Sequence, residues 1–162
     1  MKTFKLLPLL FILLFSFNSC EWISSEDGKC AVSNASKLTY NISSPKVKIS
    51  YSDSFIDDYL GFSKIEVEST LTITKTPCGE SPRTVFTQYQ SHTVTSSTPY
   101  VFSYSYMGYV DLNNTADYVT VAVEVKLLIN GRLLETYNKT KDYQYLKNAE
   151  HNVTPYFNIY IN

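Results

Sequence analysis

Residues 118–138 read YVTVAVEVKLLINGRLLETYN and contain the clearest structural signal in the chain. Apolar side chains occupy every second position from Val119 to Ile129, which is the period of a β-strand with one buried face. That face consists of Val119, Val121, Val123, Val125, Leu127 and Ile129. The stretch therefore predicts a long strand with one side against a hydrophobic core.

Asn130-Gly131 follows this strand directly and is a strong signal for a hairpin. A type I′ turn needs a positive φ at both central residues, and Asn followed by Gly meets that need best. A two-residue loop places Leu127 opposite Leu134. It also places Lys126 opposite Glu135, and opposite charges across an antiparallel ladder favour that register. The sequence therefore predicts an antiparallel hairpin that turns at this dipeptide.

The two-residue period recurs along most of the chain, between turn signals formed by Pro, Gly and Ser. Segments 46–52, 64–75, 84–95, 100–106 and 156–161 are predicted to be strands, and segment 38–42 is a weaker candidate. No stretch has a convincing helical period, so we expect seven or eight strands and an all-β fold. The expected architecture is an antiparallel, immunoglobulin-like β-sandwich. The alternative is a lipocalin-like up-and-down β-barrel, which would enclose a ligand.

The composition argues against several classes of protein. The chain has 162 residues, which suits a single domain. Its 14 Lys and Arg against 15 Asp and Glu give no basic excess, so we expect no nucleic-acid partner. Only five glycines are present, and the motifs GxSxG, HExxH, GxxxxGKS/T and GxGxxG are absent. We therefore expect a protein that is not an enzyme and that binds no cofactor.

The first twenty residues, MKTFKLLPLLFILLFSFNSC, have the composition of an export signal. Lys2 and Lys5 form a positive start, and residues 6–15 form an apolar run that only a proline interrupts. This run is too short to span a bilayer but fits the hydrophobic region of a secretory signal peptide. An ordinary signal peptidase needs small residues before its cut, and Phe17 and Asn18 do not meet that need.

The segment Phe17-Asn18-Ser19-Cys20 resembles a bacterial lipobox, in which the cysteine is acylated and becomes the mature N-terminus. It departs from the commonest pattern, because Phe17 replaces a leucine and Asn18 replaces a small residue. The resemblance implies that Cys20 is the site of lipidation. The alternative is an ordinary secreted chain that begins with an incidental cysteine.

In its general plan the chain resembles small bacterial lipoproteins that carry a single immunoglobulin-like β-sandwich. The matching features are the lipobox-like segment, the acidic stretch after it and the late Asn-Gly hairpin. The resemblance implies a lipoprotein signal peptide at 1–19, a lipid-anchored acidic tether at 20–36 and a β-sandwich domain at 37–162. It also implies attachment to a membrane of the cell envelope, expected to be the outer membrane, on a face that the sequence leaves open.

The chain contains three cysteines, Cys20, Cys30 and Cys78. If Cys20 carries lipid, Cys30 and Cys78 remain as one pair in an oxidising compartment. A bridge between them would close a loop of about fifty residues, worth about 4 kcal/mol in the chain-entropy model. The alternatives are two free thiols or a pairing that includes Cys20. No CxxC or CxxH spacing is present, so we expect no metal site at these cysteines.

Four tyrosines crowd one predicted strand and its end, namely Tyr100, Tyr104, Tyr106 and Tyr109. Tyrosine combines a flat apolar ring with a polar tip, which suits sugars and protein partners. An outward face would be a recognition surface, whereas an inward face would be part of the core. Val101, Ser103 and Ser105 on the opposite face are too small and polar to form a core, so the inward orientation is favoured. The only tryptophan, Trp22, lies in the tether, which argues against a carbohydrate-binding module.

The remaining candidate side chains have ordinary structural explanations. His92 is expected on an exposed strand face, because nothing in the sequence supplies the nucleophile and acid that a catalytic base needs. His151 is expected in a polar loop. Asp53, Asp57 and Asp58 are expected in a solvated acidic loop, because their spacing fits no calcium-loop template.

These observations favour a non-enzymatic, lipid-anchored cell-envelope protein that presents a β-sandwich for protein–protein or surface recognition. The alternative function is a lipoprotein that binds a small ligand, either a sugar or a lipid. A ligand-binding barrel would contain a large interior pocket, whereas a plain sandwich would have a filled core.

Overall fold

The computed structural model describes Cys30, residues 37–145 and residues 151–162. The predicted signal peptide, the lipidation site Cys20 and most of the predicted tether lie outside the described residues. The secondary-structure elements, in chain order, are β1 (Leu38–Ser43), β2 (Lys46–Tyr51), α2 (Asp53–Tyr59), β3 (Ile65–Thr76), β4 (Arg83–Thr93), β5 (Tyr100–Ser103), β6 (Met107–Leu112), β7 (Tyr118–Ile129), β8 (Arg132–Gln144), β9 (Asn152–Val153) and β10 (Tyr156–Ile161).

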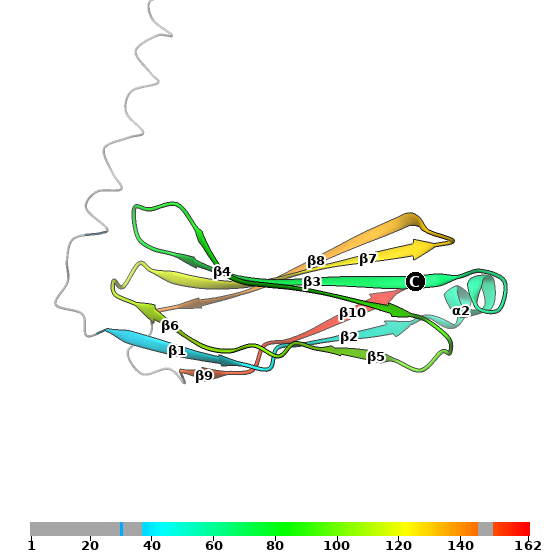
Figure 1. Cartoon of the computed structure of the whole chain (residues 1–162), viewed down its shortest axis with the longest axis horizontal. Helices are drawn as coiled ribbons and strands as arrows, with labels where there is room; N and C mark the ends of the chain where they lie inside the picture. Colours follow the sequence, from blue (N-terminus) through cyan, green and yellow to red (C-terminus); the bar gives the residue numbers. More distant parts are fainter. Residues whose placement is uncertain (1–29, 31–36, 146–150) are drawn as a thin grey trace, which may run out of the picture.

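The strands form two layers that face each other (Figure 1). One layer is a four-stranded sheet in the order β4-β3-β7-β8. The other layer contains two three-stranded sheets, β6-β1-β9 and β10-β2-β5, which lie end to end. The predicted all-β sandwich is therefore confirmed. The sheets do not close on themselves, so the lipocalin-like barrel considered as the alternative is wrong.

The second layer is divided because its three long strands break at the same level. Pro45 separates β1 from β2, and Pro155 separates β9 from β10. Proline has no backbone N–H to donate to a ladder, and Ser44 before Pro45 has a φ of 43°, outside the strand region. The carbonyls still accept across the break, from Lys46 N to Pro155 O at 2.8 Å and from Tyr104 N to Pro45 O at 3.0 Å. The two small sheets therefore act as one bent layer.

With the broken strands counted as single ones, the sandwich has seven long strands, within the predicted number. Lettered A to G along the chain, the two layers are CBEF and DAG. In a constant-type immunoglobulin domain the layers are ABED and CFG. Both folds therefore pack a four-stranded layer on a three-stranded one, but different strands lie side by side. Most pairs are antiparallel as expected, but β1–β9 and β2–β10 are parallel. The first and last long strands run in the same direction because an even number of direction reversals separates them.

The core lies between the layers and follows the predicted alternation closely. Ile129, at the end of the predicted inward face of β7, is half-buried. The other inward positions, from Ile65 to Ile73 and from Val119 to Leu127, are buried, namely Ile65, Val67, Ser69, Leu71, Ile73, Val119, Val121, Val123, Val125 and Leu127. Ser69 is the one polar residue among them. Its hydroxyl accepts a hydrogen bond of 2.6 Å from the Tyr104 hydroxyl, which is also buried. Burial raises the pKa of Tyr104 to about 12, so this hydroxyl stays protonated and remains a donor at neutral pH.

Replacing Ser69 with alanine is expected to lower the free energy of unfolding by about 1 to 3 kcal/mol. The Tyr104 hydroxyl would then be buried without an acceptor. Adding Tyr104→Phe removes that orphaned hydroxyl and should recover most of the loss. Urea denaturation of the wild type, both single variants and the double variant measures this cycle. A double variant no more stable than Ser69→Ala would contradict the prediction.

The β7–β8 hairpin forms as predicted, but its predicted register away from the turn is wrong. Lys126 pairs with Thr136, and Leu127 pairs with Glu135. Both predicted pairs, Lys126 with Glu135 and Leu127 with Leu134, are therefore wrong. The shift occurs because Leu134 is an extra residue in β8, which makes a β-bulge close to the turn. The predicted Lys126–Glu135 pair contributes too little free energy to keep the predicted register, because exposed charge pairs add little to stability.

A short helix was not expected from the sequence. Asp53, Asp57 and Asp58 lie on α2 rather than in the predicted acidic loop. Ser52 caps the helix, because its side chain accepts a hydrogen bond of 3.2 Å from Phe55 N, and the Phe55 side chain is buried in the core. Seven residues make about two turns, which is too short for a helical period to emerge from the sequence.

The predicted strand at 100–106 is also divided in the structure. Its first part is β5, and the chain then bends before β6, which the sequence did not predict. The weaker candidate at 38–42 is confirmed as β1.

Candidate recognition surface

The structure divides the four tyrosines that the sequence singled out. Tyr104 is buried, with 1% of its surface exposed, and Tyr100 and Tyr106 are half-buried against the core. These three point inward, which is the orientation that the sequence favoured. Tyr109 on β6 is 74% exposed, beside the exposed Met107. The four side chains therefore do not form a continuous outer surface, and Tyr109 is the one of them that a partner could cover.

His92 is half-buried rather than exposed, which corrects the prediction. Its ring stacks on the Tyr100 ring, with centroids 3.6 Å apart and an angle of 5° between the planes. Burial of the imidazole lowers the pKa of His92, because the charged form loses hydration. The residue therefore helps to hold β4 over β5. His151 is also half-buried, with its ring edge-on to that of Tyr40 at 5.7 Å.

The protonation of His92 gives a pH dependence with a defined sign. Its pKa is lowered below 6.5 in the folded protein, so the unfolded chain takes up the proton first as the pH falls. The stabilising contribution of neutral His92 is present above that pH and is lost as the pH falls through the folded pKa. We expect the free energy of unfolding to decrease from pH 7 to pH 5, and to decrease less in His92→Gln. Urea denaturation at both pH values measures this, and equal decreases in the two proteins would contradict it.

Two further contacts close the same side of the sandwich. The Phe86 ring on β4 lies 4.7 Å from the Tyr106 ring, measured between centroids. Between these rings and His92, the Gln90 side chain donates a hydrogen bond of 2.9 Å to Ser103 O on β5. From Phe86 to His92, strand β4 is therefore covered by β5 and by Tyr106 after it, which leaves little room for a ligand along this stretch.

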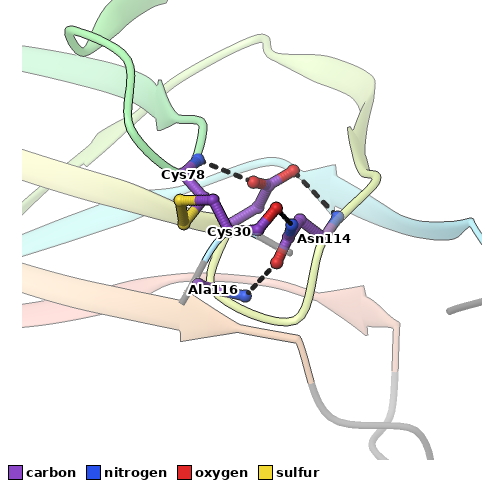
Figure 2. Close-up of a disulfide and its surroundings, with 5 residues drawn as sticks. Cys30, Cys78, Asn114 and Ala116 are labelled. Carbon is purple, nitrogen blue, oxygen red and sulfur yellow. Dashed lines mark hydrogen bonds between the residues drawn. A yellow bond between two sulfur atoms is a disulfide. The ribbon is translucent and has the colours of Figure 1, made fainter. Parts of the chain in front are cut away.

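Cys30 and Cys78 form a disulfide at the end of the sandwich where β1 begins (Figures 1 and 2). Their Cα atoms are 5.6 Å apart, which is an ordinary disulfide separation. The predicted pairing of these two cysteines therefore agrees with the structure. The bridge joins the segment before β1 to the loop that follows β3.

A buried carboxylate organises the loops around this disulfide. Asp117 is only 4% exposed, and its carboxylate accepts hydrogen bonds from Cys78 N at 2.8 Å, Asn113 N at 2.8 Å and Asn114 N at 3.2 Å. The Asn114 side chain in turn donates to Cys30 O at 3.3 Å (Figure 2). Each loop at this end is thus tied to the next.

The opposite end of the sandwich is formed by α2, the loop after it and the β7–β8 turn (Figure 1). Asn130 and Gly131 have φ values of 52° and 77°, as a type I′ turn requires. Asn130 N donates to Lys64 O at 2.8 Å, and Lys64 N donates to the Asn130 side chain at 2.9 Å. These two bonds fix the tip of the hairpin against the loop that follows α2.

The side chains at this end form what we call the distal patch. It consists of the exposed Phe62, Leu133 and Leu134, the half-buried Tyr59 and Ile129, and Arg132. Phe62 is 84% exposed, Leu133 is 57% exposed and Leu134 is 53% exposed. All members except Phe62, together with Asn130, line a groove of about 570 Å³. The β-bulge adds an extra residue here, so consecutive leucines are presented beside the turn.

The groove of the distal patch is lined by apolar side chains, Asn130 and one cation, Arg132, which takes part in no ion pair with the described residues. Within the described ranges, no group of three or more His, Cys, Asp or Glu side chains is placed to hold a metal ion. No helix in the described part of the chain has the length and apolarity needed to cross a membrane.

Comparison with known proteins gives no relative: the chain matches no protein-family model, no curated protein and no solved structure. The function is therefore argued from the chain's own residues. The distal patch was missed at the sequence level, although two consecutive leucines one residue after an Asn-Gly turn are a usable signal. They stand where a solvent-exposed hairpin end ordinarily carries polar side chains.

Proposed function

We propose that the chain is a lipid-anchored protein of a bacterial cell envelope that catalyses no reaction and binds a protein partner through its distal patch. The observation that carries this proposal is the position of the exposed apolar side chains. Three of them, Phe62, Leu133 and Leu134, lie in the loop after α2 and on β8 beside its turn, at the end of the sandwich opposite the Cys30–Cys78 disulfide (Figure 1). Clustered, exposed apolar side chains mark interaction sites in soluble domains.

The proposed anchor and the distal patch would act together. A flexible segment of ten residues, such as that between Cys20 and Cys30, spans about 17 Å on average. The sandwich would therefore stay close to the membrane, with its disulfide end nearest the lipid. The distal patch would then point away from the membrane, toward a partner.

Replacing Cys20 with alanine tests the anchor. The variant should move from the detergent-rich phase to the aqueous phase on detergent partitioning, because no acyl chain remains to hold it. Cys30→Ser is the matched control, since it removes a cysteine outside the lipobox-like segment and should still partition with detergent. Partitioning of Cys20→Ala like the wild type would disprove lipidation at Cys20.

A photo-crosslinking amino acid at position 134 tests recognition. Irradiation of intact cells should give a discrete adduct from position 134, and the Leu133→Ser substitution should weaken it. The control is the same amino acid at Tyr89, which is exposed on the outer face of β4, away from the hairpin turn. The same adduct pattern from both positions, or no adduct from position 134, would count against the proposal.

A further inference from the structure

The two layers of the sandwich differ by one strand, and the unmatched strand is β8. Strand β4, at the other edge of the same sheet, packs on β5 through His92 and on Tyr106, just before β6, through Phe86. Every residue of β8 except Tyr137 and Tyr143 is exposed, whereas its neighbour β7 alternates regularly between buried and less buried positions. In Figure 1 the hairpin rises away from the opposite layer toward its turn. Much of the core-facing side of β8 is therefore uncovered.

The core-facing side of β8 carries Lys139 and Lys141 between Tyr137 and Tyr143, with Glu135 nearer the turn. In the ladder, Val121 is opposite Lys141, and Val123 is opposite Lys139. Cross-strand partners project from the same face of a sheet, and both valines point into the core. The Lys141 ammonium lies 5.6 Å from the centroid of the Phe157 ring on β10. Neither lysine pairs with a carboxylate among the described residues.

Strand β10 has a free hydrogen-bonding edge beside the face of β8 that carries Lys139 and Lys141. Lys46 N donates to Pro155 O, and Ser52 N donates to Ile161 O, so the odd-numbered residues of this strand direct their peptide groups toward β2. Peptide groups alternate in direction along a strand. The N–H and C=O groups of Tyr156, Asn158 and Tyr160 therefore point to the edge that no described strand covers.

The free edge has the composition of a strand that pairs readily. Residues 156–161 read YFNIYI and contain no charge, no proline and no glycine. Such a segment at a sheet edge is a template for another strand. Beyond β10 and opposite β8, the second layer has no strand among the described residues. We call this position the lane.

We propose that the lane accepts one extended segment of a partner protein, with acidic side chains at the alternate positions that face Lys139 and Lys141. The segment would pair with the edge of β10 and complete the three-stranded layer to four strands, as in recognition by β-strand addition. This interaction is independent of the distal patch, which lies at the end of the molecule.

We expect the lane to hold one strand of a partner rather than a second copy of the sandwich, because β8 would obstruct the second copy. A second copy of the sandwich that paired through its own β10 would bring a four-stranded layer with it. That layer would have to enter the space that β8 already occupies. A single strand meets no such obstacle, and its carboxylates would pair with two lysines that have no carboxylate partner among the described residues.

The test uses the full chain in detergent micelles and a fluorescein-labelled peptide as long as β10 that alternates glutamate with threonine. Fluorescence anisotropy should show saturable binding. The Asn158→Pro substitution should weaken binding about ten-fold, because it removes one N–H from the free edge and crowds the approaching strand. Asn158→Ala is the matched control and should bind like the wild type, since the exposed Asn158 side chain points to solvent rather than into the lane.

A second variant, Lys139→Glu with Lys141→Glu, leaves the backbone of β10 unchanged and tests the charges separately. It should bind the glutamate peptide about ten-fold more weakly and should prefer a peptide with lysine in place of glutamate. No saturable binding, or equal binding of both peptides by the wild type, would overturn the proposal. So would a concentration-dependent dimer that Asn158→Pro abolishes, because the lane would then hold a second copy.

Discussion

Replacing both Cys30 and Cys78 with serine is expected to lower the free energy of unfolding by about 4 kcal/mol. The two cysteines are 48 residues apart, and their bridge restricts the unfolded chain over that length. In the folded protein the bridge also holds the segment before β1 against the loop after β3. Both effects are lost together in the double variant. Urea denaturation of the full chain, followed by far-ultraviolet circular dichroism, measures the change.

Reduction of the wild-type protein is the matched control for this variant. Wild type in reducing agent should unfold at the same urea concentration as the double variant, and oxidised wild type at a higher one. The dependence of the free energy on urea should increase slightly, because the open unfolded chain exposes more surface. An oxidised wild type no more stable than the double variant would show that the bridge contributes nothing.

Asp117→Ala is expected to lower the free energy of unfolding by about 4 kcal/mol. The buried carboxylate of Asp117 accepts three backbone hydrogen bonds, and no other described side chain can replace it. Its removal leaves three N–H groups without an acceptor in a site that water reaches poorly. Hydrogen bonds to a charged acceptor are worth more than neutral ones, so the loss exceeds that of an ordinary side-chain contact. The same urea denaturation measures it.

Asp58→Ala is the control for this prediction, because Asp58 is exposed on α2 and its removal should change stability by less than about 0.5 kcal/mol. The combination of Asp117→Ala with the double serine variant should lose less than the sum of the separate losses. Asp117 binds Cys78 N directly, and neighbouring changes of this kind are not additive. Strict additivity would mean that the carboxylate and the disulfide stabilise the end of the sandwich independently.

The long strands could be predicted from the sequence because their signals are local. The alternation through 118–129 and 64–75 reports a single buried face, and Asn130-Gly131 reports a turn whose dihedral angles few other residues adopt. The end of β5 at Ser103, before the predicted end at residue 106, has no such local signal. The break there depends on Pro45 in a neighbouring strand, whose carbonyl accepts from Tyr104. The parallel pairing of β2 with β10 is likewise a consequence of topology.

The candidate sites were harder to predict because they depend on contacts between distant parts of the chain. Phe62 joins the distal patch only because the loop that carries it is bound to Asn130, far along the sequence. From the sequence alone, Lys139 and Lys141 would be assigned to the solvent-facing side of a strand. The register of β8 with β7 turns that face toward the core side. His92 was expected to be exposed because its neighbours are polar, yet the Tyr100 ring covers it.

The parallel pairing of β2 and β10 determines how the sandwich would respond to a mechanical load. Leu38 and Ile161 lie at opposite ends of the second layer, and both strands run from the disulfide end toward the distal end. A pull between these residues would slide the strands along each other and strain all their hydrogen bonds at once. Bonds loaded together in shear fail at a much higher force than bonds opened one after another. A partner strand held on β10 would therefore transmit tension through β2 to the tether without unzipping the domain.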